Sequence, residues 1–421
     1  MKYKPANREE LKALCDDESV YLGDIDTSLI TDMSELFDGS FRKDFSGIES
    51  WDVSNVENMS HMFKSSLFNH PIDSWDVSKV RNMSEMFYAS HFNQPLNSWD
   101  VSNVENMNGM FRDTFFNQPL DSWDVSKCKD MSYMFFDSFF NHPLNSWNVS
   151  SVKDMNNMFC YGSFDQPLHS WDVGNVENMQ RMFWESAFNH PINSWNVSKV
   201  KNMHGMFRRS AFNQPLDSWD VGNVEDMELM FSETNFNHPL DKWNVGSVVK
   251  MWGMFKRSAF NKPLNSWDVS RVEDMNWMFL RTSFNHPLDS WDVSNVKSMQ
   301  CMFESSSFNQ PINSWNVSKV EDMRGMFRFS SFNQPLDSWD VRKVEDMSSM
   351  FEDSNFNQPI NSWDVSNVVK MYSMFAYSSF NQPLDSWDVS KAEGTKDMFE
   401  ECPYSHPLES WRDKNPFKQD I

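Results

Sequence analysis

The sequence lacks the features that mark several large classes of protein. No CxxC pair occurs, and the five cysteines are an odd, scattered set: Cys15, Cys128, Cys160, Cys301 and Cys402. This pattern argues against a disulfide framework or a zinc site, and reduced thiols favour a cytoplasmic location. No run of about 18 apolar residues occurs, so we expect no membrane-spanning helix. The N-terminal segment also has no apolar run of the kind found in secretory signals.

Positive charge is in deficit as well. Lys and Arg number 37 against 60 Asp and Glu, which gives a net charge of −23. A polyanion of this size repels phosphate backbones and anionic lipids, so the composition argues against nucleic-acid binding and membrane insertion. Glycine is scarce, at 12 residues, whereas aromatic residues make up 15% of the chain. Disordered acidic proteins contain few aromatic residues, so we expect a folded chain.

A repeat explains this skewed composition. Sixteen tryptophans follow one another at intervals of 24 residues from Trp51 to Trp411, and those outside the series are Trp184, Trp252 and Trp277. An earlier turn begins near Ile25, which stands in the place of the tryptophan. We count about seventeen turns without a linker between them. The usual expectation of two or three domains for this length therefore gives way to one elongated domain.

Eight positions of each turn are apolar, and their spacing changes along the turn. Trp75 and Val77 alternate with polar neighbours, which predicts a β-strand. Val80, Met83 and Met86 then follow at steps of three, which predicts a short helix or 3-10 turn. Two columns hold 29 of the 31 methionines, and their spacing favours the core over copper ligation. We therefore predict an α/β solenoid with one parallel β-strand and one short helix or 3-10 turn per repeat.

Two polar columns repeat as regularly as the core. In almost every turn Asn follows a phenylalanine that stands just before the Pro-containing corner, as Asn69 follows Phe68 and Asn93 follows Phe92. We call this residue the corner phenylalanine. The column of Asn predicts a ladder of side-chain hydrogen bonds between turns. Asp or Asn follows each tryptophan of the series up to Trp387, and the first four members are Asp52, Asp76, Asp100 and Asp124. This Asp column has two interpretations. Each carboxylate bonds a nearby backbone amide or serine, or the row collects Ca²⁺ or a basic partner.

The turns differ from one another mainly beside the methionines and after the phenylalanine that follows them. These places carry aromatic and cationic residues of the types enriched at interfaces: Trp184, Arg208, Arg209, Trp252, Lys256, Arg257 and Trp277. The four cations of this set form the one local basic spot on an acidic chain. We treat the set as candidate protein-binding residues. Drift at unconstrained exposed positions is the alternative interpretation.

Both ends of the repeat region differ from its middle, as expected for the caps of a solenoid. Asn7 followed by Glu10 is typical of a capping box, which predicts a helix through Leu11 and Leu14. We therefore predict an N-terminal helical cap over residues 1–21, a repeat solenoid over residues 22–411 and a C-terminal cap or tail over residues 412–421.

The repeat resembles that of a known family. The segment FNQPLNSWDVSNVENM that begins at Phe92 is similar to the repeat of the BspA-family leucine-rich-repeat surface proteins, a repeat first described as a domain of unknown function in mycoplasmas. The resemblance covers about residues 22–411. It implies a right-handed, leucine-rich-repeat-like solenoid, a cell-surface location, a role in adhesion or host interaction, and no catalytic residues. Val80 and its equivalents replace the usual Asn of leucine-rich repeats, so the hydrogen-bonding spine must run elsewhere.

Four classes of function are open at this point, and a purely structural role is one of them. We expect a monomeric, non-enzymatic scaffold for protein–protein interaction that uses no cofactor. An acidic rod that binds Ca²⁺ or basic partners through the Asp column is the alternative. An enzyme is the third class, but the sequence shows no glycine-rich phosphate loop, nucleophile elbow or metal motif. The compartment stays open, because the unpaired cysteines favour the cytoplasm and the resemblance favours the cell surface.

Overall fold

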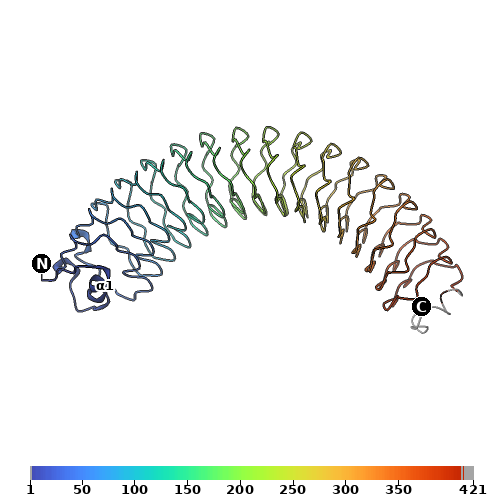
Figure 1. The fold of residues 1–421 in the computed structure, drawn as a ribbon, viewed down its shortest axis with the longest axis horizontal. Coiled ribbons are helices and arrows are strands. Elements are labelled where there is room, and N and C mark those ends of the chain that lie inside the picture. Colours follow the sequence, from blue (N-terminus) through green and yellow to red (C-terminus); the bar gives the residue numbers. More distant parts are fainter. Residues whose placement is uncertain (1, 409–410, 412–421) are drawn as a thin grey trace. The chain divides into compact units, whose positions relative to one another are not determined.

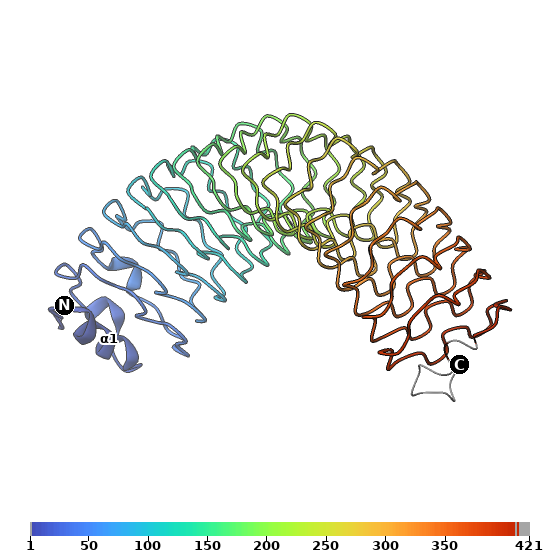
Figure 2. The same ribbon diagram turned by 45° about the vertical axis from the view of Figure 1, so that its right-hand side comes forward.

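The computed structural model describes residues 2–408 and 411, and the chain divides into two compact units, Met1–Gln214 and Pro215–Ile421. Within each unit the turns of the repeat lie side by side in sequence order, so each unit is a repeat solenoid (Figures 1 and 2). The helical elements of the described residues are α1 (Arg8–Asp16), η1 (Leu22–Asp24) and η2 (Ile48–Ser50). None of these three helices has the length and apolar composition needed to cross a bilayer.

Helix α1 confirms the capping box at the N-terminus. The Asn7 side chain accepts the backbone N–H of Glu10 at 3.0 Å. The Glu10 carboxylate reaches back to the N–H of Ala6 at 2.8 Å, one residue before the expected position. Leu11 and Cys15 are the buried residues of the helix. The boundaries of cap, solenoid and tail stay a prediction, and the predicted tail at 412–421 lies outside the described residues.

The tryptophan, methionine and phenylalanine columns form the core, as predicted. Trp75 is 4% exposed, and Met83 and Met86 are fully buried. Trp51 and Trp75 stack with ring centroids 6.4 Å apart and planes inclined by 1°. Each buried side chain of this size contributes about 1.5–3 kcal/mol, so every added turn brings its own share of the core. The cysteines are all free, and burial raises the pKa of Cys128 to about 12.

The predicted β-strand at the tryptophan is wrong. Among the described residues the structure holds no strand, only isolated parallel bridges. One joins Tyr3 to Ile25, and the others join neighbouring turns one residue before the first methionine or its equivalent. The chain between Trp75 and Val80 bends instead. The N–H of Ser78 donates to the Asp76 carboxylate, and the N–H of Val80 donates to the Val77 carbonyl at 2.9 Å. The alternation of Trp75 and Val77 therefore marks a short extended piece between two turns.

The predicted helix or 3-10 turn beside the methionines is also wrong. Glu85 and Ala89 have φ angles of 51° and 53°, and the same two positions are left-handed in each described turn. Regular helices require negative φ throughout, so this segment is a series of tight turns. We call it the arm; in this turn it comprises residues 83–89. The N–H groups of Met83, Glu85, Phe87 and Ala89 donate to carbonyls of the next turn at 2.7–3.0 Å. The N–H of Met86 donates to Met83 within its own turn at 3.2 Å.

Side-chain ladders supply the hydrogen-bonding spine. The indole N–H of Trp123 donates to the Leu96 carbonyl of the preceding turn at 2.9 Å, and the other described tryptophans of the series repeat this contact within each unit. The Asn ladder is confirmed, because the N–H of Asn93 donates to the Asn69 side chain at 2.9 Å. These ladders and the arm take the role that strand pairing has in a sheet. The right-handed sense of the stack stays a prediction.

Candidate binding surface

The arm divides its side chains between the core and solvent. In one turn the core receives Met83, Met86 and Phe87. In this turn four positions stay partly or fully exposed, and we call these positions of every turn the outer arm: Ser84, Glu85, Tyr88 and Ala89. In some turns a side chain of the outer arm is buried, as at Leu229 and Ser232. A left-handed φ at the second and fourth positions disfavours β-branched residues. Most other side chains are allowed, so the chemistry of the outer arm can change without a change in the backbone.

An arginine gathers three aromatic rings on the outer arm of the N-terminal unit. The Arg112 guanidinium carbon lies 4.9 Å from the ring centre of Tyr88, 5.1 Å from that of Tyr133 and 5.0 Å from that of Phe136. The four residues come from three successive turns. A guanidinium over aromatic faces contributes about 0.5–2 kcal/mol per contact, depending on its exposure. The cluster therefore holds an amphipathic surface in one arrangement before any partner binds.

Trp184 lies in a second cluster of the same unit. Arg181 and Arg208 lie against its ring, each with the guanidinium carbon 4.5 Å from the centroid. This sandwich leaves Trp184 only 8% exposed. The indole N–H donates to Glu185 at 3.2 Å, and the same carboxylate oxygen accepts a hydrogen bond from Arg209 at 3.0 Å. The structure thus brings together three predicted residues, with Arg208 on the Trp184 ring and with Trp184 and Arg209 both bonded to the Glu185 carboxylate. Their role in binding stays a prediction.

The C-terminal unit assembles the other two predicted tryptophans. Trp252 and Trp277 come from successive turns, with ring centroids 4.7 Å apart, and both are partly exposed. The Lys256 ammonium lies 3.9 Å from the Trp277 ring centre and 5.9 Å from that of Trp252. Arg257 is exposed beside them in sequence. The predicted basic spot combines Arg208 and Arg209 of the N-terminal unit with Lys256 and Arg257 of the C-terminal unit. That the four cations form one spot stays a prediction.

The Asp column forms local turns. In the first four members, one carboxylate oxygen accepts the backbone N–H two residues later at 3.0–3.1 Å: Asp52, Asp76, Asp100 and Asp124. The serine hydroxyl and N–H hold the pKa of Asp76 and of Asp124 below the usual range. This confirms the interpretation that each carboxylate bonds a nearby amide. Cation binding by the column stays a prediction, and the turn already uses one of the two oxygens.

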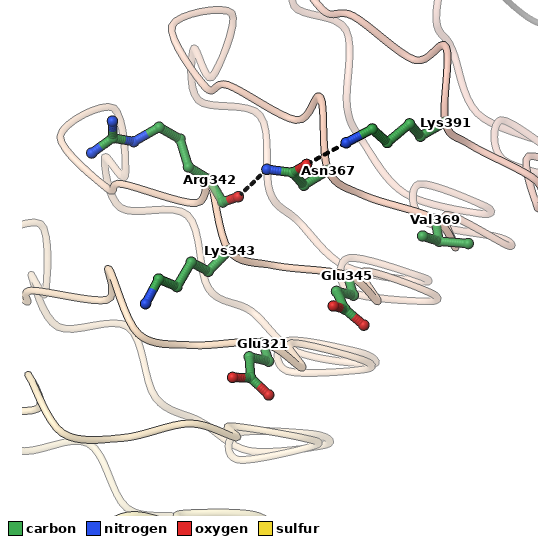
Figure 3. Close-up of a pocket in the computed structure, with 7 residues that line it drawn as sticks. All are labelled: Glu321, Arg342, Lys343, Glu345, Asn367, Val369 and Lys391. Carbon is green, nitrogen blue, oxygen red and sulfur yellow. Dashed lines mark hydrogen bonds between the residues drawn. The ribbon is translucent and has the colours of Figure 1, made fainter.

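A recess of about 390 Å³ opens on the C-terminal unit outside the outer arm (Figure 3). Its lining residues are Glu321, Arg342, Lys343, Glu345, Asn367, Val369 and Lys391. The Asn367 side chain donates to the Arg342 carbonyl at 2.8 Å and accepts from Lys391 at 2.6 Å. Arg342 replaces a serine or glycine of other turns and pairs with Asp340 at 2.8 and 2.6 Å. Cations and carboxylates are interleaved here, so the recess favours neither sign of ligand strongly.

Sequence reasoning missed most of the N-terminal aromatic cluster. Tyr161 lies 5.5 Å from Phe136 and 6.3 Å from Trp184 between ring centroids, so it links the two clusters of that unit. A signal was available: neither left-handed column holds Val, Ile, Thr or Pro in any turn, although the core columns are rich in Val. That absence marks both columns as left-handed. It would have revealed the backbone conformation at Tyr133 and Tyr161, two aromatic residues of the linked clusters.

The comparisons with known proteins identify the repeat. The sequence model of a family described as "Mycoplasma protein of unknown function, DUF285" matches seven overlapping segments: 10–115, 92–186, 112–211, 161–262, 208–307, 233–334 and 328–419. The comparison with curated proteins gives no match. Among solved structures, the chain is similar to the leucine-rich-repeat ectodomain of the plant receptor kinase GASSHO1/SCHENGEN3 from Arabidopsis thaliana, solved in complex with CASPARIAN STRIP INTEGRITY FACTOR 2. Identity is 8% and the TM-score 0.29, over 81% of this chain and 53% of the other. The match therefore spans about half the length of that ectodomain chain.

Proposed function

The chain belongs to the family of the Mycoplasma protein of unknown function, and we propose that it is a non-enzymatic repeat scaffold that binds other proteins through its outer arm. One contrast carries the proposal. Inside each unit, the core columns and the ladders repeat from turn to turn, whereas the outer arm changes its side chains and gathers aromatic and cationic residues. Solenoids use such surfaces for extended recognition of partners.

The exposed tryptophan pair suits a binding role. Trp, Tyr and Arg dominate the residues that carry binding energy in protein interfaces. Trp252 and Trp277 contact each other and Lys256 in the free protein, so partner binding orders few additional rotamers. Each side chain also keeps a large apolar surface partly open to solvent. These properties support Trp252 and Trp277 as the centre of one contact area.

Adhesion or host interaction is the finer form of this proposal, and the family resemblance supports it. It requires that the chain reach the cell surface. Limited proteolysis of intact cells, followed by mass spectrometry of the released peptides, tests this requirement. Peptides released from intact cells would support adhesion. Release only after lysis would place the scaffold role inside the cell.

Crosslinking with mass spectrometry in the native organism tests the binding role itself. The chain is expected to crosslink to specific proteins through lysines near the outer arm, such as Lys256. Replacement of Trp252 and Trp277 by Ser is expected to weaken capture tenfold or more, which corresponds to about 1.4 kcal/mol. Serine occupies the same two columns at Ser60 and Ser349, so the backbone accepts it.

Lys319→Ser is the matched control, because it changes an exposed residue outside the outer arm in a column that holds serine at Ser247. It is expected to capture partners like the parent. Equal capture by the Trp252/Trp277 variant would contradict the outer arm as the contact surface. Loss of capture above roughly 0.3 M salt, alike in parent and variants, would instead favour a charge-driven role of the Asp column.

A further inference from the structure

An exposed apolar ridge runs along the first turns of the N-terminal unit. Three of its residues each stand directly before the phenylalanine at the corner of their turn, and Phe41 is their equivalent in the first turn. We call this set the apolar ridge: Phe41, Leu67, Phe115 and Phe139. Phe41 stands four residues after Phe37, as Leu67 does after Phe63. The four side chains are 85%, 45%, 63% and 56% exposed in that order. Between Leu67 and Phe115 the column holds His91, which is also exposed.

The fold does not require apolar residues in this column. The C-terminal unit has the same turns and ladders, yet from residue 235 to residue 379 the column holds only small residues: Asn235, Ala259, Ser283, Ser307, Ser331, Asn355 and Ser379. An exposed Phe forgoes the roughly 1.5–3 kcal/mol that burial of such a side chain provides. A contiguous exposed apolar patch on a folded chain is typical of an interaction surface. The ridge therefore marks a surface that a partner covers.

Charge beside the ridge narrows the nature of that partner. Asp113 and Asp137 stand two residues before Phe115 and Phe139. Burial is the main cause that raises the pKa of Asp113; the Arg112 charge opposes this rise, and the Asp137 charge adds to it. The Arg112 guanidinium lies 3.5 Å from the Asp113 carboxylate. With a net charge of −23 on the whole chain, a second copy or an anionic membrane is repelled, whereas a cationic segment is attracted.

The spacing of the ridge selects the conformation of the partner segment. The Phe115 and Phe139 rings stack with centroids 5.3 Å apart and planes inclined by 18°. An α-helix repeats every 5.4 Å along its axis, whereas same-face residues of an extended strand are about 6.8 Å apart. Successive helical turns therefore stay in register with successive turns of the stack. A strand would be out of register by about a quarter of a turn after two residues and by more than half a turn after four.

We propose that the apolar ridge docks an amphipathic α-helix of a partner protein, with one apolar side chain per helical turn on the ridge and Lys or Arg beside Asp113 and Asp137. This inference rests on the proposed protein-binding function and names the class of partner for a second surface. From Leu67 to Phe139 the ridge covers three steps between turns, or about 16 Å at the 5.3 Å spacing of Phe115 and Phe139. About eleven residues of helix span that length at 1.5 Å per residue.

A synthetic helix tests the proposal in solution. The probe is a fluorescein-labelled 18-residue peptide of Leu and Lys, with Leu on one helical stripe and Lys on both flanks. Fluorescence anisotropy measures its binding to the full chain and to a Leu67→Ser, Phe115→Ser, Phe139→Ser variant. Serine is native to this column at Ser163, so folding is expected to persist, and circular dichroism of the variant verifies this. The variant is expected to bind the probe at least tenfold more weakly than the parent.

Three comparisons separate the ridge from general attraction to an acidic chain. Leu29→Ser removes an exposed apolar side chain outside both the ridge and the outer arm, in a column that holds serine at Ser151. This variant has the same net charge as the parent and is expected to bind the probe like it. Asp113→Asn with Asp137→Asn is expected to weaken binding several-fold at low salt, and less at high salt. A peptide with the same composition but Leu at every second position, which favours a strand, is expected to bind more weakly than the helix.

Several outcomes would overturn the ridge proposal. Equal probe binding by the serine variant and the parent is one. A dimer of the parent in sedimentation velocity that the serine variant loses would show a second copy as the occupant. Co-sedimentation of the parent, but not of the variant, with phosphatidylcholine vesicles would show a lipid surface instead. Crosslinking in the native organism tests the scaffold role independently. If the ridge does not bind the probe, the proposal for the outer arm is unaffected. If the chain captures no protein at all, both proposals are contradicted.

Discussion

The indole ladder makes the sharpest prediction about what holds the stack together. Trp147 is 2% exposed, and its N–H donates to the Leu120 carbonyl at 2.9 Å. Replacement by Phe keeps an aromatic ring in the core but removes this donor and about two carbon atoms of buried surface. The Leu120 carbonyl also accepts the backbone N–H of Trp123 at 3.2 Å, so it is not left without a donor.

The expected cost follows from these two losses. The hydrogen bond accounts for about 1 kcal/mol, because the acceptor keeps a second donor. Two buried carbon atoms add about 1.6 kcal/mol at 0.8 kcal/mol each. Trp147→Phe should therefore lower the free energy of unfolding by about 2.5 kcal/mol. Trp147→Ala should cost about 3–5 kcal/mol, and Met131→Leu, a change of similar volume, less than about 1.5 kcal/mol.

Urea unfolding followed by circular dichroism measures these values. Hydrogen exchange with mass spectrometry over residues 120–147 shows whether the loss is local, because the turns of a repeat protein can unfold in part. A Trp147→Phe variant no less stable than Met131→Leu would refute the reasoning, since the indole bond would then contribute nothing to the spine.

Two further predictions concern the arm and the Asp column. Gly109 has φ 59°, and a Cβ placed there would lie 3.1 Å from the Glu85 side chain. Gly109→Ala should therefore destabilise the fold by about 1–2 kcal/mol. Ala89 has φ 53°, so Ala89→Gly should stabilise the fold by up to about 1 kcal/mol, as thermal melts would show. Equal losses at both positions would contradict the left-handed backbone. The folded-state pKa values of Asp76 and Asp124 are lowered, so their stabilisation is present above the unfolded value of about 3.9 and is lost as pH falls through the folded values. A variant with Asn at both positions should therefore lose less stability between pH 5 and pH 2 than the parent, and an unchanged acid titration would contradict this assignment.

The sequence predicted the repeat, the core residues and the Asn ladder better than it predicted the backbone conformation. Strict recurrence of Trp75, Met83 and their equivalents revealed the repeat, the core and the Asn ladder, because periodicity reports which residues share an environment. It did not report the backbone conformation. The steps of three at Val80, Met83 and Met86 suit a helix as well as they suit a series of turns. A pattern of apolar positions does not show that an intervening residue such as Glu85 has a left-handed φ.

The candidate surfaces were predictable only in part. Trp252 and Trp277 were recognisable as additions to a regular pattern, and the structure places them together. The burial of Trp184 depends on Arg181 of its own turn and Arg208 of the next turn, which composition alone does not reveal. The apolar ridge was visible as Phe115 and Phe139, but their exposure depends on which way the chain turns after the left-handed residue.

A saturation mutational scan of the full chain, scored by resistance to protease, tests the central claim most directly. If the turns are held by their core columns and ladders, most substitutions at the tryptophan, methionine and corner Asn positions should abolish resistance. Exposed outer-arm positions should accept nearly every residue, with Val, Ile, Thr and Pro excluded at the two left-handed columns. Outer-arm positions as intolerant as the methionine columns would contradict the division between a fixed stack and a surface free to vary.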